Sequence, residues 1–63
     1  SEKERYAKIC IVVEEADETL FWLEMLVEAD LIPKYKTVEI ENETLEILKV
    51  MSGYKKRLSQ CLQ

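Results

Sequence analysis

The sequence has no histidine, and it has one glycine and one proline among its 63 residues. Without histidine, the chain lacks the commonest general base and the commonest metal ligand. A single glycine excludes the glycine-rich loops that cradle phosphates. Ser1, Ser52 and Ser59 have no base that could activate them as nucleophiles. We therefore expect a protein that is not an enzyme and that holds no cofactor.

Long apolar runs are also absent. The longest, Ile9 to Val13, is far shorter than the roughly 20 residues that span a bilayer. No signal peptide is visible at the start of the chain. Cys10 and Cys61 do not have the spacing of metal ligands, and they suit two reduced, mostly buried thiols better than a disulfide. We expect a cytoplasmic protein that does not enter a membrane.

Hydrophobic spacing predicts a first helix over about residues 2–30. Ser1 and Glu4 match a capping box, and no glycine or proline follows before Ala29. The run from Ile9 to Val13 could form a buried strand by propensity, but no turn signals flank it. Apolar residues at spacings of three and four mark one helical face: Tyr6, Ile9, Val13, Ala16, Leu20, Leu23 and Val27.

Pro33 predicts a break, because proline disfavours the helical conformation at the residue before it. A second helix is expected over about 38–62, with Thr37 as its N-cap and Glu39, Glu41 and Glu43 near its positive dipole end. Gly53 lies in mid-helix at a cost of about 1 kcal/mol, which suggests close packing against a neighbour. The apolar spacing of this helix follows one stripe: Ile40, Thr44, Ile47, Met51, Tyr54, Leu58 and Cys61.

Both helices carry more apolar surface than one contact can bury, and 63 residues lie near the lower limit for a self-sufficient core. We therefore expect a single unit over residues 1–63, an all-α antiparallel helical hairpin that forms half of a four-helix bundle. Partner subunits, or helices preceding this segment, would supply the other half. The residues expected to pack in the bundle or oligomer are Ile9, Val13, Leu20, Trp22, Leu23, Ile47, Met51, Tyr54 and Leu58.

Acidic residues dominate the middle of the chain, with eleven acidic and two basic groups between residues 14 and 46. Glu14, Asp17 and Glu18 share one helical face. Bundles that bind two metal ions on carboxylates also need Glu-x-x-His pairs, which are missing here. A solvated acidic face or a rim of subunit contacts, with no metal, is the favoured interpretation.

Basic residues gather toward both ends of the chain, where there are seven basic and two acidic groups. An antiparallel hairpin brings them together at one end, a set we call the basic end: Lys3, Arg5, Lys8, Lys55, Lys56 and Arg57. Such a cluster can contact phosphates. The last three could instead complement the dipole of the second helix, an explanation that does not cover the first three.

Two stretches of the chain read Ser-Glu-Lys-Glu-Arg at residues 1–5 and Glu-Glu-Ala-Asp-Glu-Thr-Leu-Phe-Trp-Leu-Glu-Met-Leu at 14–26. Together they resemble the small bacterial "four helix bundle protein" family. Members are encoded in intervening sequences of large-subunit ribosomal RNA genes and elsewhere in bacterial genomes. The resemblance implies that the chain corresponds to helices three and four, and that the two N-terminal helices with their Ser-Ile-Pro-x-Asn-Ile-Ala-Glu-Gly segment are missing. It also implies a ring-like homo-oligomer, a pentamer, and no catalytic residues.

Two functional hypotheses follow. Accessory proteins of retroelements that are related to this family resemble nucleic-acid partners with a basic surface, so the leading hypothesis is an RNA-associated bundle protein that uses the basic end. The alternative is a structural or protein-interaction module without a nucleic-acid role, which docks through its apolar stripes and its acidic residues.

Overall fold

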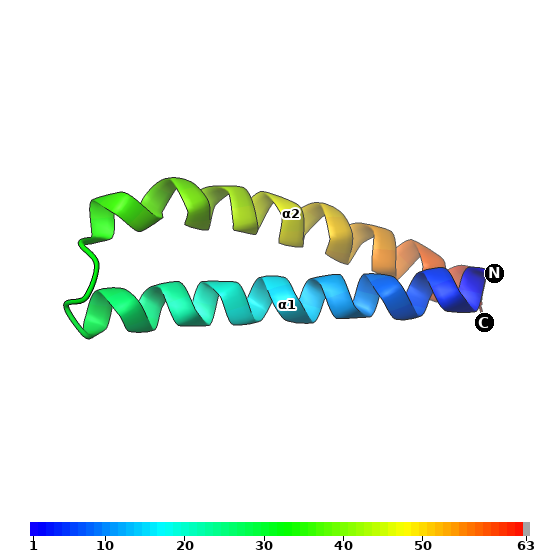
Figure 1. The fold of residues 1–63 in the computed structure, drawn as a ribbon. Coiled ribbons are helices and arrows are strands. Elements are labelled where there is room, and N and C mark those ends of the chain that lie inside the picture. Colours follow the sequence, from blue (N-terminus) through cyan, green and yellow to red (C-terminus); the bar gives the residue numbers. More distant parts are fainter. Residues whose placement is uncertain (63) are drawn as a thin grey trace.

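The fold is two antiparallel helices joined by a short turn, seen in a computed structural model that describes residues 1–62 (Figure 1). Helix α1 spans Glu2–Glu28 and helix α2 spans Lys34–Cys61. They form a rod of 45 × 15 × 14 Å in which the start of α1 and the end of α2 lie at the same end (Figure 1). The predicted all-α helical hairpin is confirmed. Over residues 1–62, neither helix has a stretch long and apolar enough to cross a bilayer.

The start of α1 is held as the capping box predicts. The hydroxyl of Ser1 accepts a hydrogen bond from the backbone N–H of Glu4 at 3.2 Å. In return, the carboxylate of Glu4 lies 3.9 Å from the backbone nitrogen of Ser1. These contacts satisfy polar groups that the first helical turn leaves without partners inside the helix.

The end of α1 is closed by a Schellman motif. The N–H of Leu31 donates to the carbonyl of Leu26, and the N–H of Asp30 donates to that of Val27, both at 3.0 Å. This motif requires a left-handed residue after the helix, and Asp30 occupies that position with a φ of 59°. Aspartate tolerates this conformation better than most residues because its short side chain can bond locally. The helix therefore ends at Glu28, two residues before the predicted end.

Helix α2 begins at Lys34, and the prediction of a start near residue 38 was wrong. Pro33 precedes the first turn with φ −69°, and its carbonyl accepts a bond from the N–H of Lys36 at 3.0 Å. Proline suits this place because a helix start needs no N–H there. Thr37 is not the N-cap: it lies inside the helix, 2% exposed, with its hydroxyl donating to the carbonyl of Lys34. The first turn of α2 consequently contains no acidic residue.

The contact between the helices, which we call the seam, uses the expected face of α1. Ile9 and Ala16 are buried, and Tyr6, Val13, Leu20, Leu23 and Val27 are half-buried. On α2 the seam is more polar than predicted and contains these residues: Thr37, Glu41, Thr44, Leu48, Met51, Lys55 and Leu58. The buried hydroxyl of Thr44 donates to the carbonyl of Ile40 at 2.7 Å, so it has a partner.

The predicted stripe of α2 is divided between two surfaces. Thr44, Met51 and Leu58 lie in the seam. Ile40 is 49% exposed, Ile47 51% and Tyr54 41%. Cys61 is also exposed and Cys10 is half-buried, so the expectation of two mostly buried thiols was wrong for Cys61. The two thiols are not joined in this structure.

The left-handed conformation at Asp30 gives a first prediction. Asp30→Gly should stabilise the fold by on the order of 0.5 kcal/mol, because glycine adopts positive φ without steric cost. Asp30→Val should destabilise it by about 1 kcal/mol or more, because a β-branched residue is strained there. Thermal unfolding followed by circular dichroism at one fixed protein concentration measures both. A valine variant as stable as the parent would contradict the assignment.

Gly53 gives a second prediction. Apart from the adjacent residues and the nearby backbone of its own helix, a Cβ atom built at this position would meet no atom within 4 Å, so the interpretation of close packing is wrong within the hairpin. Gly53→Ala should raise the free energy of unfolding by about 1 kcal/mol, because alanine favours the helix interior. Urea unfolding measures the change. A destabilised variant would show that a further subunit packs closely on this position.

Candidate functional site

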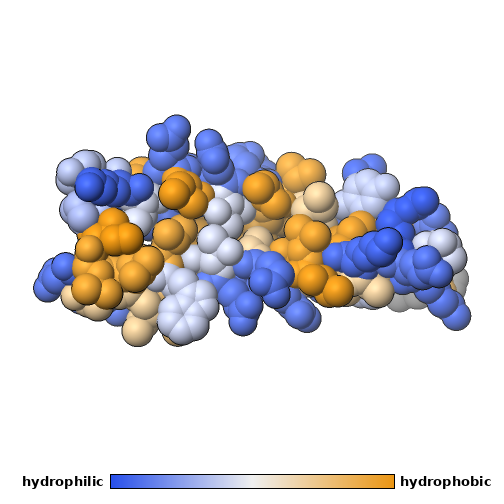
Figure 2. Space-filling model, in the orientation of Figure 1, coloured by the Kyte–Doolittle hydropathy of each residue, from blue (hydrophilic) through white to orange (hydrophobic). Residues whose placement is uncertain are grey.

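The basic end is assembled by the antiparallel arrangement of the two helices (Figure 1). Arg5 of α1 and Arg57 of α2 line the same shallow depression, together with Glu2, Tyr54, Leu58 and Cys61. Hydrophilic side chains gather at this end of the rod in the space-filling view (Figure 2). Two guanidinium groups from different helices thus face one depression, as expected from the chain direction.

Each of the two arginines has a partner on its own helix. The Nη1 atom of Arg5 lies 2.9 Å from Oε1 of Glu2. The Cζ atom of Arg57 lies 5.8 Å from the centroid of the Tyr54 ring, in a cation–π arrangement. The Arg5–Glu2 pair is exposed, so the pair is weak and leaves Arg5 able to exchange Glu2 for a phosphate.

The four lysines of the basic end differ in exposure. Lys3, Lys8 and Lys56 are exposed, whereas Lys55 is half-buried in the seam. A lysine in such a position packs its carbon chain against apolar neighbours and keeps its ammonium group toward water. Lys3, Lys8 and Lys56 are therefore the most accessible cations of the set.

The favourable interaction of Lys55, Lys56 and Arg57 with the dipole of α2 does not explain why the basic end is basic. The last turn of α2 contains no basic residue, because Lys55, Lys56 and Arg57 all precede it. Interactions with the dipole fall off within the last turn. The dipole of α2 therefore accounts for little of where these cations lie.

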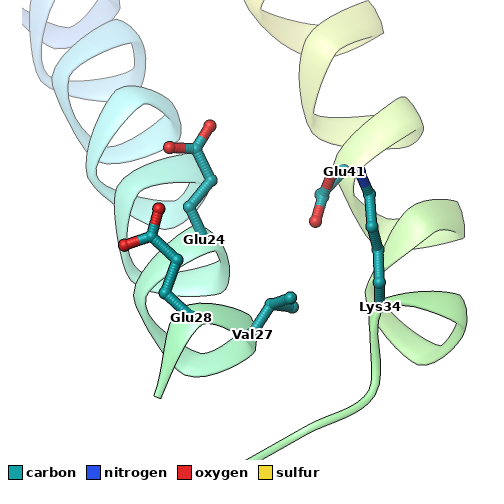
Figure 3. Close-up of a pocket in the computed structure, with 5 residues that line it drawn as sticks. All are labelled: Glu24, Val27, Glu28, Lys34 and Glu41. Carbon is teal, nitrogen blue, oxygen red and sulfur yellow. The ribbon is translucent and has the colours of Figure 1, made fainter. Parts of the chain in front are cut away.

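An acidic depression lies at the opposite end, near the turn (Figure 3). Glu24, Val27 and Glu28 of α1 line it together with Lys34 and Glu41 of α2. Among residues 1–62, no group of three or more potential ligand side chains is placed to hold a metal ion. Glu14, Asp17 and Glu18 are all exposed to solvent on α1.

The expected packing residues occupy three different environments. Ile9 and Leu58 are buried in the seam, and Val13, Leu20, Leu23 and Met51 are half-buried there. Trp22 is 60% exposed, and Ile47 and Tyr54 are also exposed. The exposed parts of those three side chains can be covered only by something outside the hairpin.

An exposed apolar line runs along α2 beside the seam, and the spacing of the apolar residues alone does not separate the two. We call it the outer stripe: Ile40, Ile47, Val50 and Tyr54. Val50, at 63% exposure, was not among the expected packing residues. Its spacing of three from Ile47 and four from Tyr54 was the available signal.

No protein-family model matches the chain, and no curated protein and no solved structure is significantly similar to it.

Proposed function

We propose that this chain is a non-enzymatic subunit of an oligomeric four-helix bundle in the cytoplasm, and that the bundle contacts RNA through the basic end. The observation that carries the assembly is the exposure of large apolar side chains. Among the described residues, fourteen large hydrophobic side chains are exposed, while only Ile9, Ala16 and Leu58 form a buried apolar core.

Exposed apolar side chains in this number support an assembly, because monomeric proteins rarely expose large apolar patches. Figure 2 shows hydrophobic side chains from both helices along the visible face of the rod. On α1, the rings of Phe21 and Trp22 meet edge to face, with centroids 5.2 Å apart, yet both remain exposed. Further helices that cover these groups would complete a bundle around the hairpin.

The RNA contact is supported by the basic end. Its cations come from two helices, Arg5 and Arg57 line one depression, and no cation of α2 lies in the last helical turn, where the helix dipole acts. The resemblance to a family encoded within ribosomal RNA genes points to RNA as the polyanion. Lysine and arginine bind RNA phosphates by releasing counterions, which makes such binding strongly dependent on salt.

Charge reversal at the basic end tests this function. Lys3→Glu/Lys8→Glu should weaken binding to a fluorescein-labelled RNA hairpin by roughly tenfold or more at low salt. It should also reduce the slope of log affinity against log salt by about 1.5, because two phosphate contacts are lost. Fluorescence anisotropy from low to moderate salt measures both quantities.

The matched control is Lys34→Glu/Lys36→Glu, which changes the charge equally at the turn end, where both lysines are also exposed. It should alter binding much less. Equal effects of the two double variants would show that RNA binding depends only on the net charge of the chain. Unchanged binding in both variants would contradict an RNA contact through the basic end.

The alternative is a protein-interaction module without a nucleic-acid role. The exposed acidic residues Glu14, Asp17 and Glu18 and the neighbouring exposed rings of Phe21 and Trp22 favour this possibility. Substituting the three acids by lysine would then disturb the assembly. Nuclease treatment before affinity purification separates the two functions, since a partner that stays bound after RNA is destroyed contradicts an RNA-dependent role.

A further inference from the structure

The outer stripe of α2 has opposite charges at its two ends. Glu43 lies seven residues before Val50, and Arg57 lies seven residues after it. Seven residues are close to two full helical turns, so the two charges lie on the same side of the helix, each about 10.5 Å from Val50. Both side chains are exposed. The surface therefore consists of an acid, an apolar centre and a base.

The side chains of this surface are already arranged for a contact. Arg57 is positioned beside the stripe because its guanidinium lies over the ring of Tyr54. Two shallow grooves lie beside the apolar centre and share Glu46 and Ile47. Asn42 and Glu43 complete the lining of the first, and Val50 and Met51 complete that of the second. Protruding apolar side chains of a facing helix could enter such grooves.

We propose that a second copy of this chain covers the outer stripe, with its α2 antiparallel to the first. A twofold axis near Val50 then brings Glu43 of each copy opposite Arg57 of the other, so that two identical ion pairs flank a centre formed by Ile47 and Val50. Such an interface is isologous, because the same patch is used on both subunits. A parallel arrangement would place like charges opposite each other and is disfavoured.

The position of the stripe around α2 determines the shape of this dimer. The stripe is displaced by roughly a quarter of a turn from the seam residues Thr37 and Thr44 at 3.6 residues per turn. Under the twofold rotation, the two α1 helices come to lie on the same side of the α2 pair. The four helices then form a square bundle, as in other four-helix proteins.

Charge over the whole rod favours the same orientation. The terminal end carries the basic set, whereas the turn end has the acidic depression of Glu24, Glu28 and Glu41. Antiparallel packing places the basic end of each copy beside the acidic end of the other. Lys3, Lys8 and Lys56 lie off the stripe, so the contact between copies leaves them available to phosphates.

This inference rests on the proposed assembly and names its partner. The test uses Glu43→Arg, Arg57→Glu, the double variant and an equimolar mixture of the two single variants. Each single reversal creates two like-charge contacts and should weaken the dimer by roughly tenfold or more. The double variant and the mixture both restore opposite charges and should recover dimerisation. Sedimentation equilibrium measures the dissociation constant, and circular dichroism confirms that each variant stays helical.

Lys49→Glu is the control for Arg57→Glu, because it changes the net charge of the chain equally at an exposed position on α2 that lies off the stripe. It should leave the dimer unchanged. A parent chain that stays monomeric would overturn both the assembly and this dimer. A parent assembly of another size, such as a pentamer, or a dimer indifferent to the reversals at Glu43 and Arg57, would overturn the antiparallel dimer alone and leave the assembly standing.

Discussion

The seam between the two helices determines what every other surface of this molecule can do. On α2 it is formed largely by polar or small side chains, with Thr37 and Thr44 buried and Glu41 and Lys55 half-buried. Each threonine hydroxyl bonds to a carbonyl of its own helix, so α2 meets α1 without leaving a buried polar atom unpaired. Leu48, Met51 and Leu58 also lie in the seam, but the apolar side chains of the outer stripe remain exposed outside it. The hairpin is thus held by a modest contact, and it offers its stronger apolar surface to other helices.

The turn fixes which surfaces meet at each end. Asp30 closes α1 through its left-handed conformation, and Pro33 starts α2 three residues later. With so short a connection, the helices must run antiparallel and in close register. This register brings Arg5 level with Arg57 and sets Glu24 and Glu28 across from Lys34 and Glu41. A local backbone conformation therefore separates positive from negative charge along the rod.

Some of this architecture could be predicted from the sequence because it depends on strong, local signals. The capping box at Ser1, the uninterrupted apolar face of α1 and the break at Pro33 are of this kind, and the basic end follows from chain direction alone. The start of α2 was misplaced because Thr37 resembles an N-cap, whereas Pro33 already provides the helix start. Periodicity also could not decide which face of α2 meets α1. Thr44 and Met51 lie in the seam, yet each is only three or four residues from Ile47, which lies in the outer stripe. The seam and the outer stripe therefore share the same helical spacing in the sequence. Only the packing of α1 against α2 shows which residues belong to each.

The separation of charge along the 45 Å rod also affects how the molecule approaches a partner. A rod with most of its cations at one tip and most of its carboxylates along the rest has a permanent electric dipole, in addition to its net charge of −4. In the field of a polyanion it experiences a torque that turns the cationic tip forward, while the remainder is repelled. A single hairpin is therefore suited to touching a polyanion end-on over a short footprint, and it is poorly suited to lying lengthwise along one.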